Sequence, residues 1–361
     1  MRFDPDKPFN DLPLLPPNVE LETKAVLKKA IAANKALAEL KGAGDLIPNQ
    51  TVLIHAIGLQ EAKLSSEIEN VVTTNDELYR AFADAGHNTN PQTKEVLYYS
   101  EALWHGFNAI RAKKRPLTTN LFVDLYQIIK QTTAGIRKGA GTKLANPSTG
   151  KIIYSPPEGE SLLRDKLANL EKFIHAEDEL DPLIKLAVIH YQFEAIHPFT
   201  DGNGRAGRIL NILYLIERGL LDIPILYLSR FIIENKNAYY IRLKEVTAAG
   251  AWEAWVLYML DAVEKTARVT RDRIQAIREL MNATGDRIRK KAPKMYSKDL
   301  VEVLFRQPYC KIKFLEEAGI GKRQTASSYL KALAEMGVSH PVRKGREIYY
   351  INKEFLDVLV K

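Results

Sequence analysis

Apolar residues recur at three- and four-residue spacing along most of the chain, which is the pattern of amphipathic helices. The first 20 residues differ, because five prolines make them an extended arm that cannot be helical. The first predicted helix stops at Gly42, a common helix terminator. The helices that the pattern predicts after the arm are 21–41, 52–71, 94–112, 121–132, 161–175, 181–193, 206–217, 236–248 and 252–289.

The helical pattern is interrupted chiefly at residues 134–159, which are rich in Gly, Pro, Ser and Thr. Within this segment, Lys151, Ile152, Ile153 and Tyr154 form the one plausible strand. We therefore expect a hairpin or flap here.

From Tyr296 onward the pattern changes to short helices followed by two strands. This order is that of a winged helix-turn-helix. The whole pattern predicts a mainly α fold, in which a helical core carries a small β-hairpin flap and a C-terminal winged helix-turn-helix domain. The C-terminal elements expected are helices at 297–306, 311–318 and 322–336, a tight turn at 319–321, and strands at 338–343 and 347–351.

Composition narrows the class of protein. A length of 361 residues allows two or three domains, and 46% apolar with 27% charged residues excludes a disordered polymer or a disulfide scaffold. The single cysteine, Cys310, cannot form an internal disulfide, which favours a reducing cytoplasm. The start lacks the features of a secretory signal, and no stretch approaches the ~20 apolar residues that span a bilayer. We expect a cytoplasmic protein with no membrane partner.

The net charge of +8 is unevenly distributed. Residues 265–361 hold 22 basic and 11 acidic side chains, a net charge of +11, which leaves −3 for residues 1–264. The basic character therefore belongs to the C-terminal quarter alone, where it suggests a polyanionic partner.

Residues 197–208, His-Pro-Phe-Thr-Asp-Gly-Asn-Gly-Arg-Ala-Gly-Arg, carry the most chemistry. Gly202 and Gly204 permit backbone angles that expose successive N–H groups just before a helix, whose N-terminus attracts anions. Arg205 and Arg208 lie three apart on the first helical turn and can clamp further phosphate oxygens. The segment therefore predicts a phosphate cradle.

Two further side chains of this segment add reaction chemistry. Asp201 supplies a hard oxygen ligand for Mg²⁺, which usually binds through one or two carboxylates plus substrate phosphates. His197 can accept a proton near neutral pH. A phosphate cradle, a metal carboxylate and a base within twelve residues indicate a transferase that uses a nucleotide.

The segment matches H-P-F-x-[D/E]-G-N-G-R-x-x-R, the signature of Fic-domain proteins, at every fixed position, so the chain resembles that family. The resemblance extends to the arm at 12–17, to Pro156 and Pro157 after the expected strand, and to the C-terminal winged helix, a common appendage. It implies an N-terminal arm and helical segment at 1–110, a Fic helical-bundle core at 111–290, and a winged-helix domain at 291–361.

The usual reaction of Fic proteins is transfer of AMP from ATP to a protein hydroxyl, with release of pyrophosphate. The resemblance implies that His197 deprotonates the attacking Ser, Thr or Tyr hydroxyl, that Asp201 holds Mg²⁺ on the α- and β-phosphates, and that Phe199 packs beneath the loop. Arg205 and Arg208 would hold the β- and γ-phosphates. The remaining expected nucleotide contacts are the anion hole of Gly202, Asn203 and Gly204, together with Ala206 and Gly207.

Two other regions are expected to complete the site. The flap edge at 151–154 would add main-chain hydrogen bonds to an extended target segment. The family lines its adenine pocket with the helix after the motif helix, and Tyr239, Tyr240 and Thr247 fall in that place here. The two tyrosines fit the role of ordinary core aromatics about equally well.

Residues 65–70, Ser-Ser-Glu-Ile-Glu-Asn, match the family's inhibitory-helix pattern [S/T]-x-x-x-E-[G/N] through Ser65, Glu69 and Asn70. The resemblance implies that Glu69 pairs with Arg208 in the place of the γ-phosphate, which gives a low basal rate. Two alternatives stay open: a solvated helix glutamate, and a glutamate that positions water for removing AMP from targets.

The winged helix has two interpretations. It binds DNA, or its basic face docks an acidic protein or a second subunit, since family members frequently form homodimers. A competing hypothesis is therefore a DNA-binding regulator whose core only senses a nucleotide; the complete motif favours a transferase that acts on target proteins and on itself. The expected DNA contacts are Lys322, Arg323, Gln324, Ser327, Ser328 and Lys331 on the helix, and Lys344 and Arg346 at the wing tip.

Overall fold

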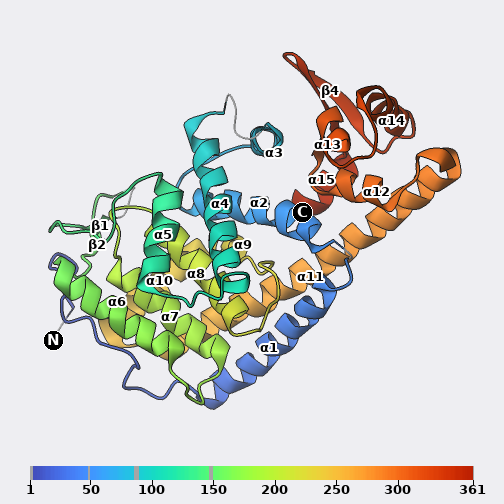
Figure 1. Cartoon of the computed structure of the whole chain (residues 1–361). Helices are drawn as coiled ribbons and strands as arrows, with labels where there is room; N and C mark the ends of the chain where they lie inside the picture. The colour runs from blue at the N-terminus through green and yellow to red at the C-terminus, as the bar shows by residue number, and fades with distance from the viewer. Residues whose placement is uncertain (1–2, 48, 85–88, 146–148, 361) are drawn as a thin grey trace.

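The computed structural model describes residues 3–47, 49–84, 89–145 and 149–360, and the mainly helical fold is confirmed (Figure 1). Part of the predicted flap segment, residues 146–148, lies outside the described residues. The helices up to residue 291 are α1 (Lys24–Gly44), α2 (Gln50–Ile68), α3 (Asn75–Ala83), α4 (Pro91–Arg111), α5 (Thr119–Lys130), α6 (Glu160–His175), α7 (Pro182–Ile196), α8 (Asn203–Glu217), α9 (Ser229–Glu234), α10 (Lys236–Ala249) and α11 (Trp252–Lys291).

Helices α7 and α8 form the centre of the core. Nearly every residue of α7 is buried, which matches a helix that is apolar on all sides and is enclosed by its neighbours. It packs against α6, α8, α11 and α1. The long helix α11 runs beside α1, as Figure 1 shows along the lower edge of the molecule, and Lys29 joins the two through Asp261 at 2.6 Å and Glu264 at 2.8 Å.

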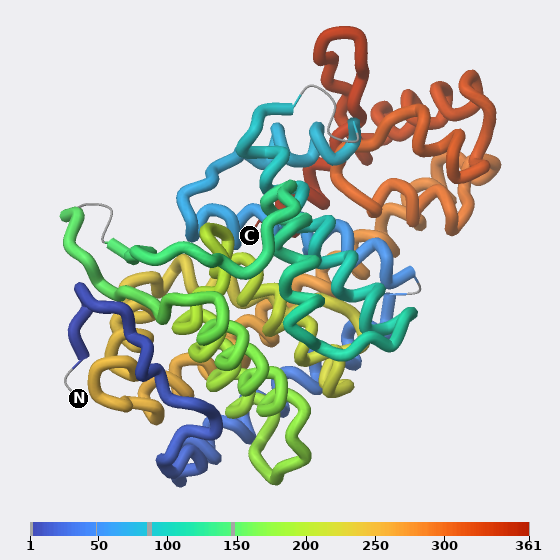
Figure 2. The backbone as a smooth tube through the Cα atoms, turned by 60° about the vertical axis from the view of Figure 1, so that its left-hand side comes forward, coloured from blue at the N-terminus to red at the C-terminus, as the bar shows by residue number. Residues whose placement is uncertain are grey.

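The flap is a short antiparallel pair, β1 (Leu144–Ala145) and β2 (Ile152–Tyr154). The N-terminal arm lies against it, with the Phe9 N–H donating to the Ser155 carbonyl at 2.9 Å (Figure 2). Further along the arm, Leu12 and Leu15 are buried, and Lys166 donates to the Leu12 carbonyl at 2.6 Å. The arm is therefore extended, as its prolines predict, and is packed onto the core.

The C-terminal domain has the element order of a winged helix-turn-helix. Strand β5 lies between β3 and β4 in one antiparallel sheet, with β4 and β5 forming the wing hairpin. Its elements are α12 (Lys298–Phe305), β3 (Tyr309–Cys310), α13 (Ile312–Glu317), α14 (Arg323–Glu335), β4 (His340–Lys344), β5 (Glu347–Ile351) and α15 (Lys353–Val360), after a 3-10 turn, η1 (Pro293–Met295).

This domain is docked onto α2 and α3 of the N-terminal segment. The Tyr309 hydroxyl donates to Asp76 at 2.9 Å, and Asp84 accepts from Lys311 at 2.9 Å and from the Tyr349 hydroxyl at 2.6 Å. Asn49 just before α2 adds a hydrogen bond to Glu302 of α12.

The structure differs from the sequence prediction mainly in short elements and helix ends. Helices α3, α9 and α15 and strands β1 and β3 are absent from the prediction, and all of them are shorter than ten residues. Helix α2 ends at Ile68 instead of Val71, and α8 begins at Asn203 instead of Ala206. Both shifts matter for the site, because they place Glu69 at a helix end and the motif glycines at a helix start. No helix in the described part of the chain is long and apolar enough to cross a membrane.

Candidate functional site

The loop between α7 and α8 is held rigid by its own side chains. His197 ends α7 in the left-handed region at φ 50°, and Gly202 precedes α8 at φ 74°, a conformation that favours glycine. The Asn203 side chain, fully buried, accepts from the Phe199 N–H and donates to the Phe199 carbonyl, both at 2.8 Å. The Asn203 side chain therefore braces the loop. The loop offers an anion the backbone N–H groups at the start of α8, which have no partner within the helix.

Phe199 packs beneath the loop. Its ring is fully buried and stacks on Tyr126 of α5, with the centroids 4.2 Å apart and the planes 3° from parallel. The Tyr126 hydroxyl also lies 3.1 Å from Thr200 Oγ1. The loop is thereby fixed to α5, a helix that also supplies a charged residue to the site.

The backbone of His197 is held by a buried arginine that has no signal in the local sequence. Arg137 Nε donates to the His197 carbonyl at 2.8 Å, and its Nη2 donates to the carbonyl of Pro157. Burial lowers the pKa of the His197 imidazole to about 4, and the positive charge of Arg137 acts in the same direction. The imidazole is therefore neutral at physiological pH and can accept a proton.

Asp201 lies at the open side of the loop, with 62% of its side chain exposed. Lys130 Nζ lies 2.6 Å from Oδ2, and the Gly202 N–H donates to Oδ1 at 2.7 Å. Burial alone would raise the pKa of this carboxyl, but the Lys130 ammonium outweighs it and lowers the pKa. Asp201 is therefore an ionised, accessible oxygen ligand.

The donor set fits a magnesium ion that is bound mostly by its substrate. Among the described residues there is no group of three or more His, Cys, Asp or Glu side chains placed to hold a metal. One exposed carboxylate beside a phosphate cradle is what Mg²⁺ needs when a nucleotide provides most of its ligands. Asp201 is the residue that would hold it.

The two motif arginines are buried and already paired. Arg205 donates from Nε to Glu69 and from Nη1 to Glu95, each at 2.6 Å, with 1% of its side chain exposed. Arg208 donates from Nη2 to Glu69 at 2.9 Å and from Nε to Ser65 Oγ at 2.7 Å. Burial alone would lower the pKa of Arg208, but the Glu69 carboxylate raises it above the usual range.

Glu69 caps the C-terminal end of α2 and pairs with both arginines, whereas the family resemblance implies a pair with Arg208 alone. The chain leaves α2 through Asn70, which has φ 64°. A Cβ on Gly204 would stand 2.6 Å from Glu69 Oε1 and 2.8 Å from Arg208 Nη1. Glycine at 204 therefore lets the Glu69 carboxylate and the Arg208 guanidinium lie this close to the start of α8.

Two more carboxyl groups lie around Arg208. Burial raises the pKa of Glu61 to about 7 and that of Glu194 to about 7, and the positive charge of Arg208 only partly compensates. The side chain of Glu194 lies against Gly207, where a Cβ would meet Oε1 at 2.7 Å and the Phe193 ring at 3.1 Å. Gly207 is thus needed for helix packing, and Ala206 is likewise buried in the core.

The three residues expected near adenine differ in their surroundings. Tyr239 is buried, and its hydroxyl lies 2.9 Å from His190 Nε2. Thr247 Oγ1 donates to the Leu243 carbonyl at 3.1 Å. Tyr240 packs edge-on against Tyr239 and has 45% of its surface exposed, so it alone of the three offers a large free surface.

The flap is tied to the motif through Tyr154, whose hydroxyl donates to the Ala195 carbonyl at 2.7 Å, two residues before His197. Lys151 is exposed and the strand Ile152–Tyr154 is half-buried. The C-terminal end of β2 is thus linked to the helix turn that precedes His197.

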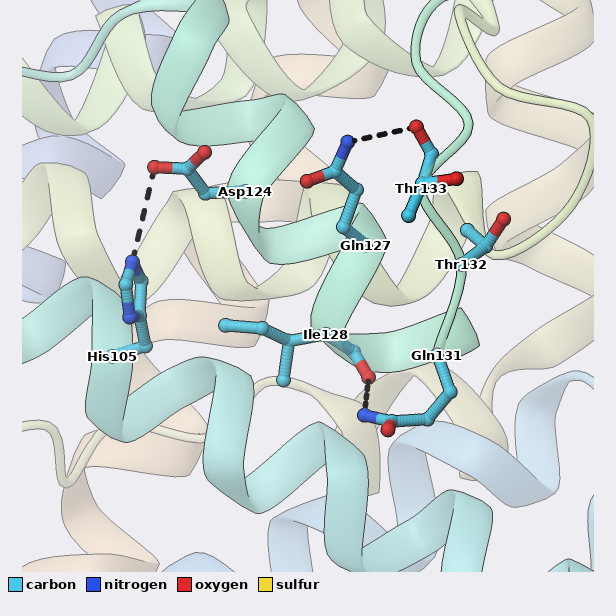
Figure 3. Close-up of a pocket in the computed structure, with 7 residues that line it drawn as sticks. All are labelled: His105, Asp124, Gln127, Ile128, Gln131, Thr132 and Thr133. Carbon is cyan, nitrogen blue, oxygen red and sulfur yellow. Dashed lines mark hydrogen bonds and ion pairs between the residues drawn. The ribbon is translucent and has the colours of Figure 1, made fainter.

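A separate surface hollow lies between α4 and α5 (Figure 3). Its polar groups are largely paired with one another: His105 Nε2 lies 3.8 Å from Asp124, and Gln131 donates to the Ile128 carbonyl at 2.9 Å. It contains neither His197 nor Asp201, and it is distinct from the motif site.

A glycine loop at a helix start, two buried arginines and a neutral histidine give this helical protein a candidate anion site beside a histidine that can accept a proton. Three family models match the chain: "Fic/DOC family N-terminal" at 27–108, "Fic/DOC family" at 116–215, and "Protein adenylyltransferase SoFic-like, C-terminal domain" at 280–355. The chain belongs to the Fic/DOC family.

Two relatives show how far the similarity reaches. A probable protein adenylyltransferase of Aquifex aeolicus is 27% identical over 190 residues, which are 52% of this chain and 54% of that protein. Protein adenylyltransferase fic-1 of Caenorhabditis briggsae is 32% identical over 108 residues, 29% of this chain and 20% of that protein. The matched region thus spans about half or less of the length of these relatives.

Solved structures show the same fold. A Fic family protein from Desulfovibrio desulfuricans G20 has a TM-score of 0.57 at 19% identity, over 93% of this chain and 98% of that one. Fic-1 (residues 134–508) from C. elegans has a TM-score of 0.52 at 18% identity, over 69% of this chain and 73% of that one.

Proposed function

We propose that this chain is a protein adenylyltransferase, which transfers AMP from ATP to a hydroxyl side chain of a protein, and that Glu69 restrains it. The observation that carries the proposal is the double pairing of Glu69 with Arg205 and Arg208, immediately beside a rigid anion loop and a neutral histidine. The names of the relatives support the same reaction.

In the proposed mechanism, His197 accepts the proton of the attacking hydroxyl. The N–H groups at the start of α8 stabilise the negative charge that develops on the α-phosphoryl group, since donors already fixed in place need no reorganisation. Mg²⁺ held by Asp201 would supply further charge neutralisation on the phosphates. Arg205 and Arg208 hold the phosphates of the leaving pyrophosphate once Glu69 has released them.

Glu69 restrains the reaction because its carboxylate pairs with both arginines. An incoming triphosphate has to displace one carboxylate from two buried guanidinium groups, and separating such pairs without a replacement costs several kcal/mol. The phosphates supply that replacement only when the end of α2 moves or when they bind in an unproductive position. A low basal rate follows.

The experiment incubates the chain with ATP labelled at the α-phosphate, both alone and with a lysate of the source cell. We expect strong labelling by Glu69→Gly, weak labelling by wild type, and none by Glu69→Gly/His197→Ala. An absence of label in every reaction would overturn the proposal. Loss of label from pre-labelled targets on adding wild type would instead favour removal of AMP, with Glu69 positioning the water.

We also propose that the C-terminal domain binds duplex DNA. Helix α14 buries Ala326, Leu330 and Leu333, which leaves its opposite face to solvent. The domain docks on α2 and α3 through β3, the C-terminal part of β5 and α12, so α14 and the wing tip project away from the core (Figure 1). The basic side chains exposed on α14 and the wing, none of which has an ion pair with any described residue, are Lys322, Arg323, Lys331, Arg343, Lys344 and Arg346.

A salt series on a labelled duplex of mixed sequence tests the DNA proposal. Affinity should fall steeply with salt, and Lys322→Glu/Arg323→Glu should weaken binding and reduce the slope of log K against log salt by roughly 2, about one per phosphate contact. The matched control is Lys28→Glu/Lys172→Glu, which changes two exposed lysines of the core equally. Equal loss in both variants, or full competition by polyglutamate, would contradict DNA and favour an acidic protein.

A further inference from the structure

A second cavity lies behind the inhibitory helix, between α2, α9 and α11. Its volume is about 530 Å³, within the usual range for sites that bind small molecules. Ile57 and Leu64 of α2, Phe231 of α9 and Val269 of α11 give it an apolar wall. None of the motif residues 197–208 lines it.

The rim of this cavity is basic. Arg230 of α9 and Lys265, Arg268 and Arg273 of α11 all line it. Three of these cations have carboxylate partners: Arg230 lies 3.2 Å from Glu234, Lys265 lies 2.7 Å from Asp261, and Arg268 lies 2.9 Å from Glu264. Arg273 has neither an ion pair nor a hydrogen bond with any residue in the described ranges.

The electrostatics of Arg273 are unfavourable as the chain stands. Burial and, to a lesser extent, the charge of Arg230 together lower its pKa to about 10, so both guanidinium groups remain protonated at neutral pH. Arg230 is paired with Glu234, which also lines the cavity, whereas Arg273 has no carboxylate partner among the described residues. The carboxyl group that lines the cavity deeply, Glu61, is bound by the hydroxyls of Ser229 and Tyr99, and burial raises its pKa to about 7. Its charge is therefore only partly present at neutral pH. A group that carries two negative charges would offset the charge of Arg273.

We propose that this cavity binds a small organic phosphate monoester, whose phosphate group lies between Arg273 and Arg230 and whose apolar body lies against Ile57, Leu64 and Phe231. Guanidinium groups match the geometry and charge of a phosphate dianion through paired N–H donors. The apolar wall excludes a purely inorganic anion as the best ligand, because such an ion would leave that surface uncovered. The site is separate from the motif and does not depend on the proposed reaction.

Phenyl phosphate is a suitable probe, because it combines a dianionic phosphate with a small apolar ring. Calorimetric titration into the full chain should show one site, with phenol and inorganic phosphate both binding much more weakly. Arg273→Met should weaken phenyl phosphate by about tenfold or more, the effect of losing one charge-assisted pair. Arg278→Met is the matched control, since Arg278 lies on the same helix, is exposed, and does not line the cavity.

Saturating ATP separates this site from the motif. Binding that persists with ATP present and is lost in Arg273→Met supports the proposal. Displacement by ATP, equal affinity of Arg273→Met and wild type, or equal loss in Arg278→Met would overturn it. Arg230→Met provides a second variant if Arg273→Met has a lowered melting temperature, and it too should bind phenyl phosphate more weakly.

Discussion

Glu69 Oε1 lies 2.9 Å from Nη2 of Arg208, and the second oxygen of the same carboxylate lies 2.6 Å from Nε of Arg205. One side chain at the end of α2 therefore occupies both arginines of the motif. Because Arg208 is also bound by Ser65 one turn earlier, α2 is joined to α8 by a connected set of buried polar contacts. In the proposed mechanism, breaking the contact with Glu69 makes the arginines available to phosphates.

Glu69→Gly should therefore bind ATP more tightly than wild type. We expect an increase of about tenfold or more, because the phosphates no longer compete with a carboxylate. Calorimetric titration with a non-hydrolysable ATP analogue measures it. Glu67→Gly is the control, because it places the same flexible residue in the same last turn, and Lys63 is the ion-pair partner of Glu67 among the described residues. Equal affinity of Glu69→Gly and wild type would argue against competition.

Arg137→Met should impair both stability and rate. Arg137 donates to the carbonyls of His197 and Pro157, so its loss leaves buried acceptors unpaired, at roughly 1–3 kcal/mol of unfolding free energy. The substitution also removes the hydrogen bond that holds the backbone carbonyl of His197. Calorimetric melting and the transfer rate in the Glu69→Gly background measure these effects. Arg164→Met, at an exposed site on α6, should change neither; similar losses in both variants would show that Arg137 has no special role.

The transfer rate should be nearly independent of pH between about 6 and 8. A base acts when it is deprotonated, and the pKa of His197 is lowered to about 4, so the imidazole is already neutral throughout this window. Initial rates in the Glu69→Gly background measure the profile. An acid limb with its midpoint near 6.5 would show that His197 titrates like an exposed histidine.

The same lowered pKa has a consequence for folding. Because the folded pKa of His197 lies below the unfolded value, its contribution to stability is present above about pH 6.5 and is lost as the pH falls toward 4. His197→Ala should remove part of the destabilisation seen on acidification. Chemical denaturation of both proteins at pH 7.5 and 5 measures this; an identical pH dependence would contradict it.

Lys130→Met should tighten metal binding. Lys130 Nζ lies 2.6 Å from the carboxylate of Asp201 and so competes with a cation for it. Removing a unit charge at this distance should raise Mn²⁺ affinity several-fold, as measured by electron paramagnetic resonance in the presence of a non-hydrolysable ATP analogue. Lys113→Met, an exposed lysine after α4, is the control. Unchanged or weaker Mn²⁺ binding in Lys130→Met would contradict a metal role for Asp201.

The parts of the site that sequence reasoning could predict are those whose residues are neighbours in the chain. His197, Asp201 and the two arginines fall within one turn and one loop, so their spacing alone places them together. Glu69 was found through a local pattern, yet its contact with Arg205 depends on where α2 ends. Helix α2 ends at Ile68, one residue before Glu69, and the Glu69 carboxylate at this helix end faces both arginines.

The remaining site residues carry no local signal. Arg137 lies in a loop 60 residues before His197, and Glu95 and Lys130 come from α4 and α5, so only the packing of these elements brings them to the motif. The short elements have little local signal, because they contain too few residues to show a hydrophobic period. Helix α3 is nine residues long, and its capping box of Thr74 and Glu77 was the one cue to its start.

The most direct test of the account compares initial rates of AMP transfer for wild type, Glu69→Gly, Glu67→Gly and Glu69→Gly/His197→Ala, with the mass gain of one AMP on intact protein as the readout. We predict fast transfer by Glu69→Gly, equally slow transfer by wild type and Glu67→Gly, and no transfer by the double variant. Equal rates for wild type and Glu69→Gly, or undiminished transfer without His197, would contradict it.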